Sequence, residues 1–162
     1  MQGTQSQRLE SESGDFIILR KDDLIAYHLA VVVDDHLQAI TDIVRGIDLM
    51  DSTPRQIWLQ QLLGYSSPNY LHIPVATNAN KQKLSKSFGA GAISLNKAAE
   101  TLISALRVLG QQPPNELDDG SLADIWRWAQ KNWNIDVLKQ ISEIPVDHIP
   151  LAKAGKSLPI NP

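Results

Sequence analysis

Three lysines and two serines lie close together in one polar stretch of the chain. In order, the stretch contains Lys81, Lys83, Leu84, Ser85, Lys86 and Ser87, followed by Gly89 and Gly91. Ammonium groups and hydroxyls on such a loop can bind phosphate oxygens, because a lysine side chain acts as a flexible point charge. Lysine-rich loops are also common as solvated surface loops. The stretch is therefore a candidate phosphate-binding loop, and a solvated loop is its alternative.

Arg45 is a candidate ligand-binding residue because of its place at the end of a strand pattern. The β-branched run at 40–45 stops at Gly46, and ligands of α/β folds usually bind beyond the carboxyl ends of strands. A guanidinium can hold a carboxylate through two hydrogen bonds. The alternative role of Arg45 is a structural ion pair with Asp42 or Asp48.

Three other groups of side chains fit structural roles better than chemical ones. Tyr27 fits an amphipathic core position with its hydroxyl at the surface. Adjacent side chains diverge on helices and strands, so the Asp-Asp-His run at 34–36 does not readily converge on one metal ion. Trp126, Trp128 and Trp133 can stack on RNA bases, but their helical spacing fits a core and its rim better. We assign no metal ligand in this chain.

Strands and helices must together position these residues in the first half of the chain. Short β-prone runs at 16–19 and 24–27 predict a hairpin. Residues 27–38 combine helical spacing with strand propensity, and we favour a helix. Strands are expected at 40–45 and 70–75, with a helix between them. Strand, helix and strand make a crossover unit, which predicts an α/β architecture with a parallel sheet.

The helix between those strands has a clear start signal. TPRQ at 53–56 combines a capping threonine, a proline suited to the first turn and a glutamine at the capping-box position. We expect this helix to end at Gly64. Arg55 and Gln56 are expected to stay available at the mouth of a site. The side chains expected to pack inward are Ile57, Leu59, Leu62 and Leu63.

The second half of the chain is helical in character. A polar loop covers 78–91, and helices are expected at 95–109, 121–133 and 135–141. SLAD at 121–124 is a capping box for the second of these helices. Prolines at 145, 150, 159 and 162 predict an extended tail. We therefore expect a domain boundary near residue 77.

The composition is that of an ordinary soluble globular protein. The chain has 162 residues, of which 43% are apolar, and its formal net charge is -3. The absence of cysteine excludes disulfides and thiolate zinc sites, and phosphate contacts must come from local patches because the chain is slightly acidic. We find neither a signal-peptide pattern nor a run of about 20 apolar residues, so we expect a cytoplasmic protein without membrane contact.

KLSKS at 83–87 differs by one letter from KMSKS, the signature of class I aminoacyl-tRNA synthetases. Several segments follow one another as in the glutamyl-tRNA synthetase group: GDFII at 14–18, AYHLAVVVDDH at 26–36, IVRGIDL at 43–49, TPRQ at 53–56, HIP at 72–74 and KLSK at 83–86. Within that group, RGIDL is similar to the R-G-x-D-L of the paralogues that attach glutamate to queuosine in tRNA(Asp). The full synthetases usually read R-G-E-D/E-H/W here.

The resemblance implies an ATP-dependent ligase. Glutamate would be activated as glutamyl-adenylate, with release of pyrophosphate, and then passed to queuosine of tRNA(Asp). The resemblance also implies that Tyr27 and Arg45 contact the glutamate and that the loop at 83–87 binds ATP. Lys86 is then the catalytic residue that meets the ATP phosphates. ATP with its Mg2+ is the expected cofactor, and no zinc is expected from this chain.

The same resemblance implies a partial enzyme. The family's HIGH motif, its early substrate residues and its zinc region all precede the segments matched here. The expected fold is α/β: a flexible lead-in at 1–13, the C-terminal half of a Rossmann-like class I catalytic domain at 14–76, and a small, mostly α-helical stem-contact domain with a proline-rich tail at 77–162. We expect the chain to be inactive alone and to need an N-terminal half as its partner.

Three alternatives remain open. The chain can be the C-terminal part of the catalytic region of an ordinary glutamyl-tRNA synthetase, although the RGIDL spelling speaks against it. It can be a non-catalytic, truncated binding module, which the missing HIGH segment favours. It can also be a structural helical adaptor in which KLSKS is accidental. The sequence does not decide between queuosine and the tRNA 3' end as the acceptor.

Overall fold

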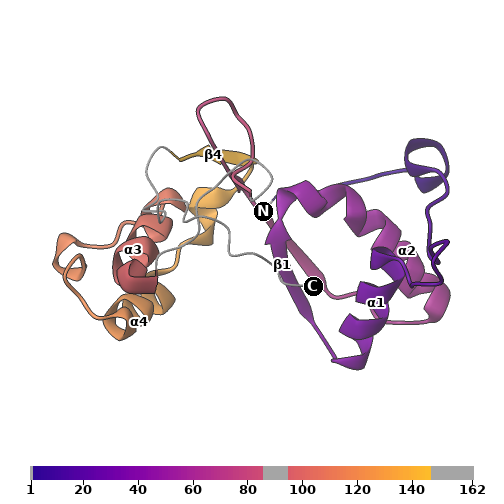
Figure 1. Cartoon of the computed structure of the whole chain (residues 1–162), viewed down its shortest axis with the longest axis horizontal. Helices are drawn as coiled ribbons and strands as arrows, with labels where there is room; N and C mark the ends of the chain where they lie inside the picture. Colours follow the sequence, from indigo (N-terminus) through magenta and orange to yellow (C-terminus); the bar gives the residue numbers. More distant parts are fainter. Residues whose placement is uncertain (1, 86–94, 147–162) are drawn as a thin grey trace, which may run out of the picture. The chain divides into compact units, whose positions relative to one another are not determined.

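The computed structural model describes residues 2–85 and 95–146 of the chain. The chain forms two compact units, Met1–Ile73 and Pro74–Pro162, and each unit contains helices and one pair of strands (Figure 1). Within the described ranges, no helix is both long enough and apolar enough to cross a bilayer.

The first unit is built on two parallel strands. β1 (Asp42–Gly46) pairs with β2 (Asn69–Ile73), with Asp42 beside Asn69 and Gly46 beside Ile73. The connection between them contains the 3-10 helix η2 (Ile47–Ser52) and the helix α2 (Thr53–Leu63). A short π-helix η1 (Leu9–Ser13) and the helix α1 (Tyr27–Leu37) precede the strands. The predicted strand–helix–strand unit with parallel strands is confirmed.

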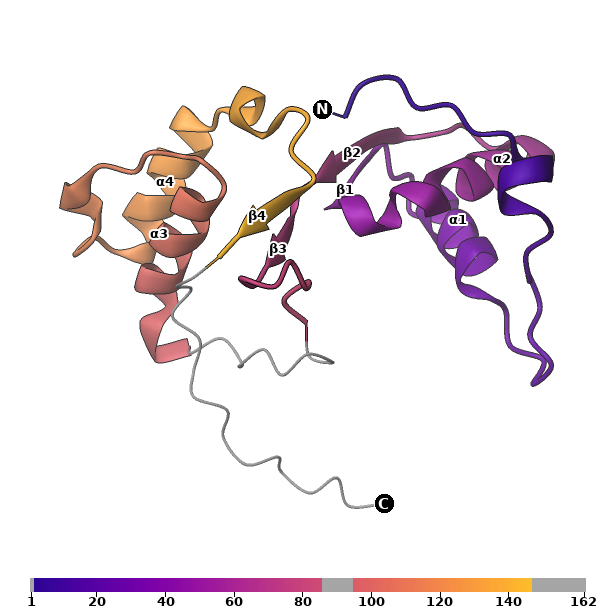
Figure 2. The ribbon, with the colours of Figure 1, turned by 90° about the horizontal axis from the view of Figure 1, so that it is seen from above.

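Both longer helices of the first unit lie on the same side of its strands, and α1 packs against α2 (Figure 2). Val32 lies at the centre of α1, and its side chain is almost completely buried. Tertiary packing therefore overrides the strand propensity of the three valines in α1. Side chains alternate between the faces of a strand, so Val44 points away from the face that carries Arg45. The Val44 side chain is 62% exposed.

The predicted hairpin at 16–27 is wrong in its extent. The structure has one antiparallel bridge, between Leu19 and Ile25, and the Ala26 N–H donates to the Ile18 carbonyl at 2.9 Å. Hairpins need apolar packing to be stable in water. Most of the segment lacks such packing, because five of its large apolar side chains are exposed; they are Ile17, Ile18, Leu19, Leu24 and Ile25.

α2 begins and ends where its sequence signals predict, but its buried face is only partly the predicted one. Gly64 ends the helix in the left-handed conformation at φ 70°, which glycine adopts without a Cβ penalty. Leu62 and Leu63 are exposed, so their predicted inward packing is wrong. Leu59 is buried as predicted, and the buried face also carries Gln56 and Gln60. The first unit therefore has a partly polar interior.

The second unit contains a helical pair and two short strands. β3 (Val75–Thr77) and β4 (Glu143–Pro145) are parallel, and α3 (Ala98–Val108) packs against α4 (Leu122–Asn132). The 3-10 helices are η4 (Leu95–Lys97), η5 (Asn115–Leu117) and η6 (Ile135–Leu138). The predicted helices are confirmed, the third as a 3-10 helix. The predicted strand at 70–75 is divided at Pro74, and β4 was not predicted.

The core of the second unit lies between α3 and α4, where Ile103 and Leu106 meet Ile125 and Ala129. Of the three tryptophans expected in the core or its rim, Trp128 packs against this cluster. The other two, Trp126 and Trp133, are exposed.

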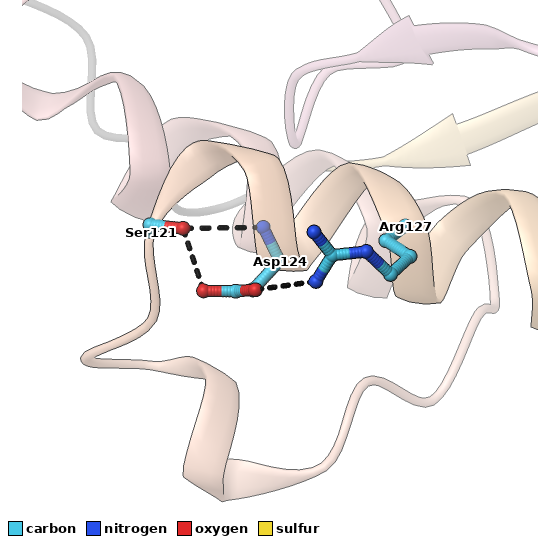
Figure 3. Close-up of polar contacts among 3 residues, drawn as sticks. All are labelled: Ser121, Asp124 and Arg127. Atoms are coloured by element: carbon cyan, nitrogen blue, oxygen red, sulfur yellow. Dashed lines mark hydrogen bonds and ion pairs between the residues drawn. The ribbon is translucent and has the colours of Figure 1, made fainter.

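α4 begins with a hydrogen-bonded cap (Figure 3). The Asp124 backbone N–H donates to Ser121 Oγ at 3.2 Å, and the Ser121 hydroxyl donates to the Asp124 carboxylate at 2.6 Å. Arg127 donates to the other carboxylate oxygen at 2.7 Å. The Ser121 hydrogen bond, and then Arg127, lower the pKa of Asp124. The predicted capping box is confirmed.

Candidate functional site

Arg45 and His72 lie side by side near the carboxyl ends of the two parallel strands. The pairing of β1 with β2 aligns Arg45 with His72. Tyr70 lies two residues earlier in β2 and therefore on the same face as His72. The rings of Tyr70 and His72 are stacked, 6.3 Å apart and 8° from parallel, and the Arg45 guanidinium lies 5.1 Å from the Tyr70 ring centre. This edge of the pair therefore presents a guanidinium that rests on an aromatic ring.

Three uncharged side chains hold the Arg45 guanidinium. Nη1 donates to Gln56 Oε1 at 2.7 Å, and Nη2 donates to Thr53 Oγ1 at 2.7 Å. Nε donates to His72 Nε2 in a longer contact of 3.4 Å. We call Thr53, Gln56 and His72, together with Arg45, the Arg45 clamp. The clamp fixes the side chain through neutral groups.

Asp42 was one of two alternative ion-pair partners for Arg45. Its carboxylate instead accepts hydrogen bonds from the Thr41 hydroxyl at 2.8 Å and from the Asn69 amide at 3.0 Å. These bonds, Thr41 first, lower the pKa of Asp42.

Thr53 and Gln56 do not have the capping role predicted for them. Ser52 is the N-cap of α2 and makes no side-chain cap hydrogen bond. Gln56 is 1% exposed, so the prediction that it stays available at the mouth of a site is also wrong. A hydrogen bond to a charged group is stronger than one to a neutral group, and a partly buried guanidinium needs acceptors. The spacing of three residues that predicted a cap also places both side chains on one helix face, beside Arg45.

Tyr27 is the first residue of α1, and its side chain is 53% exposed. Its ring meets the His28 ring edge to face, with the centres 5.4 Å apart. Tyr27 makes no hydrogen bond to Arg45, but both residues act electrostatically on the Tyr70 hydroxyl. Burial is the largest cause of the raised pKa of Tyr70. Tyr27 and Arg45 thus both act on Tyr70, but no hydrogen bond joins them.

The clamp residue His72 and the nearby His28 both have lowered pKa values. Burial lowers the pKa of His72, and the Arg45 guanidinium lowers it further. Burial also lowers the pKa of His28, followed by the charges of Arg55 and Arg45. In neutral His72, the ring nitrogen that faces Arg45 and Thr53 can accept from both, since Thr53 Oγ1 lies 3.0 Å from it. Sequence reasoning did not identify His72, although its place two residues after Tyr70 in a strand is a usable signal.

A cavity of about 570 Å3 lies beside the clamp in the first unit. Thr53, Tyr70 and His72 line it together with Trp58 and with polar side chains of the N-terminal segment, such as Gln5. Arg45 is not among its lining residues. We therefore do not assign this cavity to the ligand of Arg45.

The candidate phosphate loop begins in the second unit, and its first residues are tied to β3. Lys83 forms an antiparallel bridge with Thr77, and the Leu84 N–H donates to the Ala76 carbonyl at 2.8 Å. Lys81 forms an exposed ion pair with Glu143, with its Nζ 3.5 Å from the carboxylate. The predicted loop residues Lys86 and Ser87 lie outside the described residues.

The Asp-Asp-His run lies at the end of α1. His36 stacks on Tyr65, which follows α2, with ring centres 3.7 Å apart and ring planes 4° from parallel. Asp35 is partly buried, and this burial raises its pKa, against the effect of Arg45. The contacts of His36 are those of a structural residue that joins the ends of the two helices.

Comparison with known families gives one match that covers most of the chain. The model of the class I tRNA synthetases (E and Q), catalytic domain, matches residues 5–118. These residues include β1, α2, β2 and the candidate phosphate loop.

Curated relatives are similar over nearly the whole chain. The chain is 48% identical over 145 residues to a glutamyl-Q tRNA(Asp) synthetase of Pseudomonas fluorescens, covering 90% of the chain and 49% of that relative. It is 51% identical over 144 residues to the protein of the same name from Dechloromonas aromatica, covering 89% of the chain and 48% of that relative. The chain thus spans about half the length of these relatives.

A solved structure shares the fold at low sequence identity. The glutamate-tRNA synthetase of Elizabethkingia anophelis superposes with a TM-score of 0.56 at 20% identity, covering 82% of this chain and 31% of that protein. A glutamate tRNA ligase of Elizabethkingia meningosepticum superposes with a TM-score of 0.53 at 20% identity. The match covers 78% of this chain and 29% of that protein. From the match over residues 5–118, the chain belongs to the family of class I tRNA synthetase (E and Q) catalytic domains.

Proposed function

We propose that this chain provides half of an enzyme that activates glutamate with ATP and transfers it to queuosine of tRNA(Asp). The observation that carries the proposal is the Arg45 guanidinium, which neutral side chains hold at the carboxyl edge of β1 and β2. The names of the relatives at 48% and 51% identity support the substrate assignment. In this proposal the first unit is the C-terminal half of a Rossmann-like catalytic domain, and the second is a stem-contact domain.

Arg45 and Tyr27 are the proposed glutamate contacts. Arg45 binds a carboxylate of glutamate through charge-assisted hydrogen bonds, and the exposed Tyr27 hydroxyl adds a further hydrogen bond. The α-carboxylate of glutamate attacks the α-phosphorus of ATP, and the bond from that phosphorus to pyrophosphate breaks. A hydroxyl of queuosine then attacks the acyl carbon, and AMP leaves. Catalysis on this route is positioning and electrostatic stabilisation of the phosphates.

The loop at 83–87 is the proposed ATP-binding loop. Its base at Lys83 and Leu84 is fixed to β3 by backbone hydrogen bonds. The role of Lys86 in meeting the ATP phosphates rests on the KLSKS spelling. Mg2+ enters with ATP in this proposal, and we assign it no ligand from this chain.

The enzyme also needs a second polypeptide segment, the N-terminal half of the catalytic domain. Two parallel strands are fewer than a stable sheet usually has, and Val44 on β1 is 62% exposed. Further large apolar side chains of the first unit are exposed at 17–25. Apolar surface of this kind is typical of an interaction face. The share of the relatives that the chain spans is consistent with such a second half.

The test is glutamate-dependent exchange of pyrophosphate into ATP. We use the chain alone and the assembled enzyme, by which we mean this chain co-expressed with the N-terminal half of the Dechloromonas aromatica relative. We expect no exchange by the chain alone and exchange without tRNA by the assembled enzyme. A strict requirement for tRNA would favour an ordinary glutamyl-tRNA synthetase, and robust exchange by the chain alone would contradict the partial-enzyme proposal.

Replacing Arg45 tests the residue that carries the proposal. In the assembled enzyme, Arg45→Ala removes a charge-assisted pair worth about 1.5 to 3 kcal/mol, so the KM for glutamate should rise roughly tenfold to a hundredfold. The control is Arg107→Ala, which removes an exposed arginine paired with Asp118 in the second unit. If Arg45→Ala leaves the KM for glutamate unchanged, Arg45 does not bind glutamate and its role is structural.

A further inference from the structure

We infer that Gln56, Thr53 and His72 are positioning residues, which orient the Arg45 guanidinium through uncharged contacts and leave its positive charge for a carboxylate ligand. The ligand part of this inference rests on the proposed function. The positioning part depends only on the contacts within the first unit.

Gln56 is the central member of the clamp. Its side chain is 1% exposed, and Oε1 accepts from Arg45 at 2.7 Å. Its other polar atom, Nε2, is buried without a hydrogen-bond partner. Burial of an amide costs free energy unless its atoms are hydrogen-bonded. An apolar residue would therefore fit this interior better if packing were the only function of position 56, so the contact with Arg45 explains the glutamine.

Thr53 and His72 support each other as well as Arg45. Thr53 Oγ1 lies 3.0 Å from His72 Nε2 and 3.4 Å from the Leu49 carbonyl oxygen. The threonine hydroxyl can therefore donate to one of these groups while its oxygen accepts from Arg45. Contacts from α2 and β2 thus fix the guanidinium on two sides, and both contacting side chains are themselves held in place.

The clamp orients a cation without neutralising it. A glutamate at position 56 would make the same hydrogen bond but would also form an ion pair, and that pair would compete with any carboxylate ligand. The groups facing His72 are the Arg45 cation, the Thr53 hydroxyl and the stacked Tyr70 ring. Burial, and then the Arg45 cation, lower the pKa of His72, which favours an uncharged partner at this position too. The resulting site is suited to an anion, because the guanidinium is oriented in advance.

Two substitutions at one position separate orientation from charge. Gln56→Ala removes the acceptor, whereas Gln56→Glu retains an acceptor and adds a negative charge. The matched control is Gln111→Ala, because Gln111 is a buried glutamine of the second unit that also makes side-chain hydrogen bonds. All three variants are expected to reduce stability, so a loss of stability alone does not identify a clamp residue.

Orientation is measured first, in this chain without any ligand. NMR of the chain labelled with 15N-arginine reports the Arg45 Nε–H signal, which Arg45→Lys identifies by its loss. We expect slow hydrogen exchange of this signal in the parent chain, in Gln56→Glu and in Gln111→Ala, and fast exchange in Gln56→Ala. Fast exchange in the parent chain, or slow exchange in Gln56→Ala, would contradict the positioning role. This conclusion does not depend on the KM for glutamate.

The charge is measured second, as the KM for glutamate in the assembled enzyme. Gln56→Glu should raise this KM about tenfold or more although Arg45 stays ordered, because the ion pair occupies the guanidinium. Gln111→Ala should leave it unchanged. If Gln56→Glu keeps the KM of the parent enzyme, the inference that the clamp leaves the charge of Arg45 available for a ligand is wrong. If instead Arg45→Ala leaves the KM unchanged, the proposed glutamate site fails, while the ordered Arg45 signal still supports the positioning role.

Discussion

Arg45 shows how a strand-end arginine can be ordered without a carboxylate in its clamp. The guanidinium donates to an amide, a hydroxyl and an imidazole, and it lies over an aromatic ring. A surface ion pair would have stabilised the fold by no more than about 1 kcal/mol. It would also have occupied the charge that a ligand needs.

The lowered pKa values of two histidines predict how the stability of the first unit depends on pH. The pKa values of His28 and His72 lie below the ordinary value of 6.5 in the folded state. Below that value the unfolded chain binds more protons than the folded chain, so the free energy of unfolding falls as the pH falls. We expect slower hydrogen exchange of the α2 amides at pH 7.5 than at pH 5.5, after correction for intrinsic rates.

The controls for this prediction are His28→Gln and His72→Gln. Each variant should flatten the pH dependence, and the double variant should flatten it most. Asp35, with its raised pKa, acts in the opposite direction at lower pH, around and above its ordinary value of 3.8. A stability that rises between pH 7.5 and 5.5 would contradict the assignment of the two histidines.

The two lysines around the KLSKS loop should differ in their effect on adenylate formation. Lys86→Ala should slow single-turnover formation of glutamyl-adenylate in the assembled enzyme more than it weakens ATP binding, because negative charge moves toward pyrophosphate in the transition state. Lys81→Ala is the control, since Lys81 is exposed and pairs with Glu143. If Lys86→Ala matches the parent rate at saturating ATP, or if Lys81→Ala is the slower variant, KLSKS is not a phosphate loop here.

At the scale of the helix, the same start signal has two different structural outcomes. SLAD at 121–124 caps α4 as its spelling predicts, because both partners belong to one turn of chain. TPRQ at 53–56 has a matching spacing, but Thr53 and Gln56 bind Arg45, which comes from another element. Local motifs could therefore predict where α2 begins. The groups that the first turn of α2 binds depend on β1, which pairs with a strand distant in sequence.

The two helix starts give a matched pair of stability variants. Ser121→Ala should lower the free energy of unfolding of the second unit by about 1 kcal/mol, because it removes the cap acceptor of α4. Ser52→Ala is the control, since Ser52 makes no side-chain cap hydrogen bond at α2. Urea denaturation followed by circular dichroism measures both. Equal losses in the two variants would show that the α4 cap adds no stability.

Sequence patterns predicted other elements unequally. The end of α2 follows from Gly64, whose left-handed backbone is a local property. The apolar run at 16–19 did not become a strand, because strand formation depends on packing that the segment lacks. Arg45 could be identified as a candidate from its place at a strand end. The contact of His72 with Arg45 could not be predicted, because it follows from the pairing of two strands that are 27 residues apart in sequence.

At the scale of the molecule, the first unit exposes many large apolar side chains, among them Ile17, Leu37 and Val44. Val44→Asp places a charge in the middle of β1 on the face away from the Arg45 clamp. We expect this variant to lose co-purification with the tagged N-terminal half of the Dechloromonas aromatica relative. Trp126→Asp, on the exposed surface of the second unit, is the control. If Val44→Asp still co-purifies with the N-terminal half, the partner does not bind at the Val44 face of β1.

The alignment of Arg45 with His72 has a consequence for how the chain folds. If β2 shifted along β1 by one residue, Tyr70 and His72 would turn to the opposite face of the pair. Gln56 would then face a guanidinium that had lost its aromatic support and one of its acceptors. Misaligned forms of the first unit are therefore destabilised selectively, so the polar groups that prepare the site also discriminate against slipped strands while the protein folds.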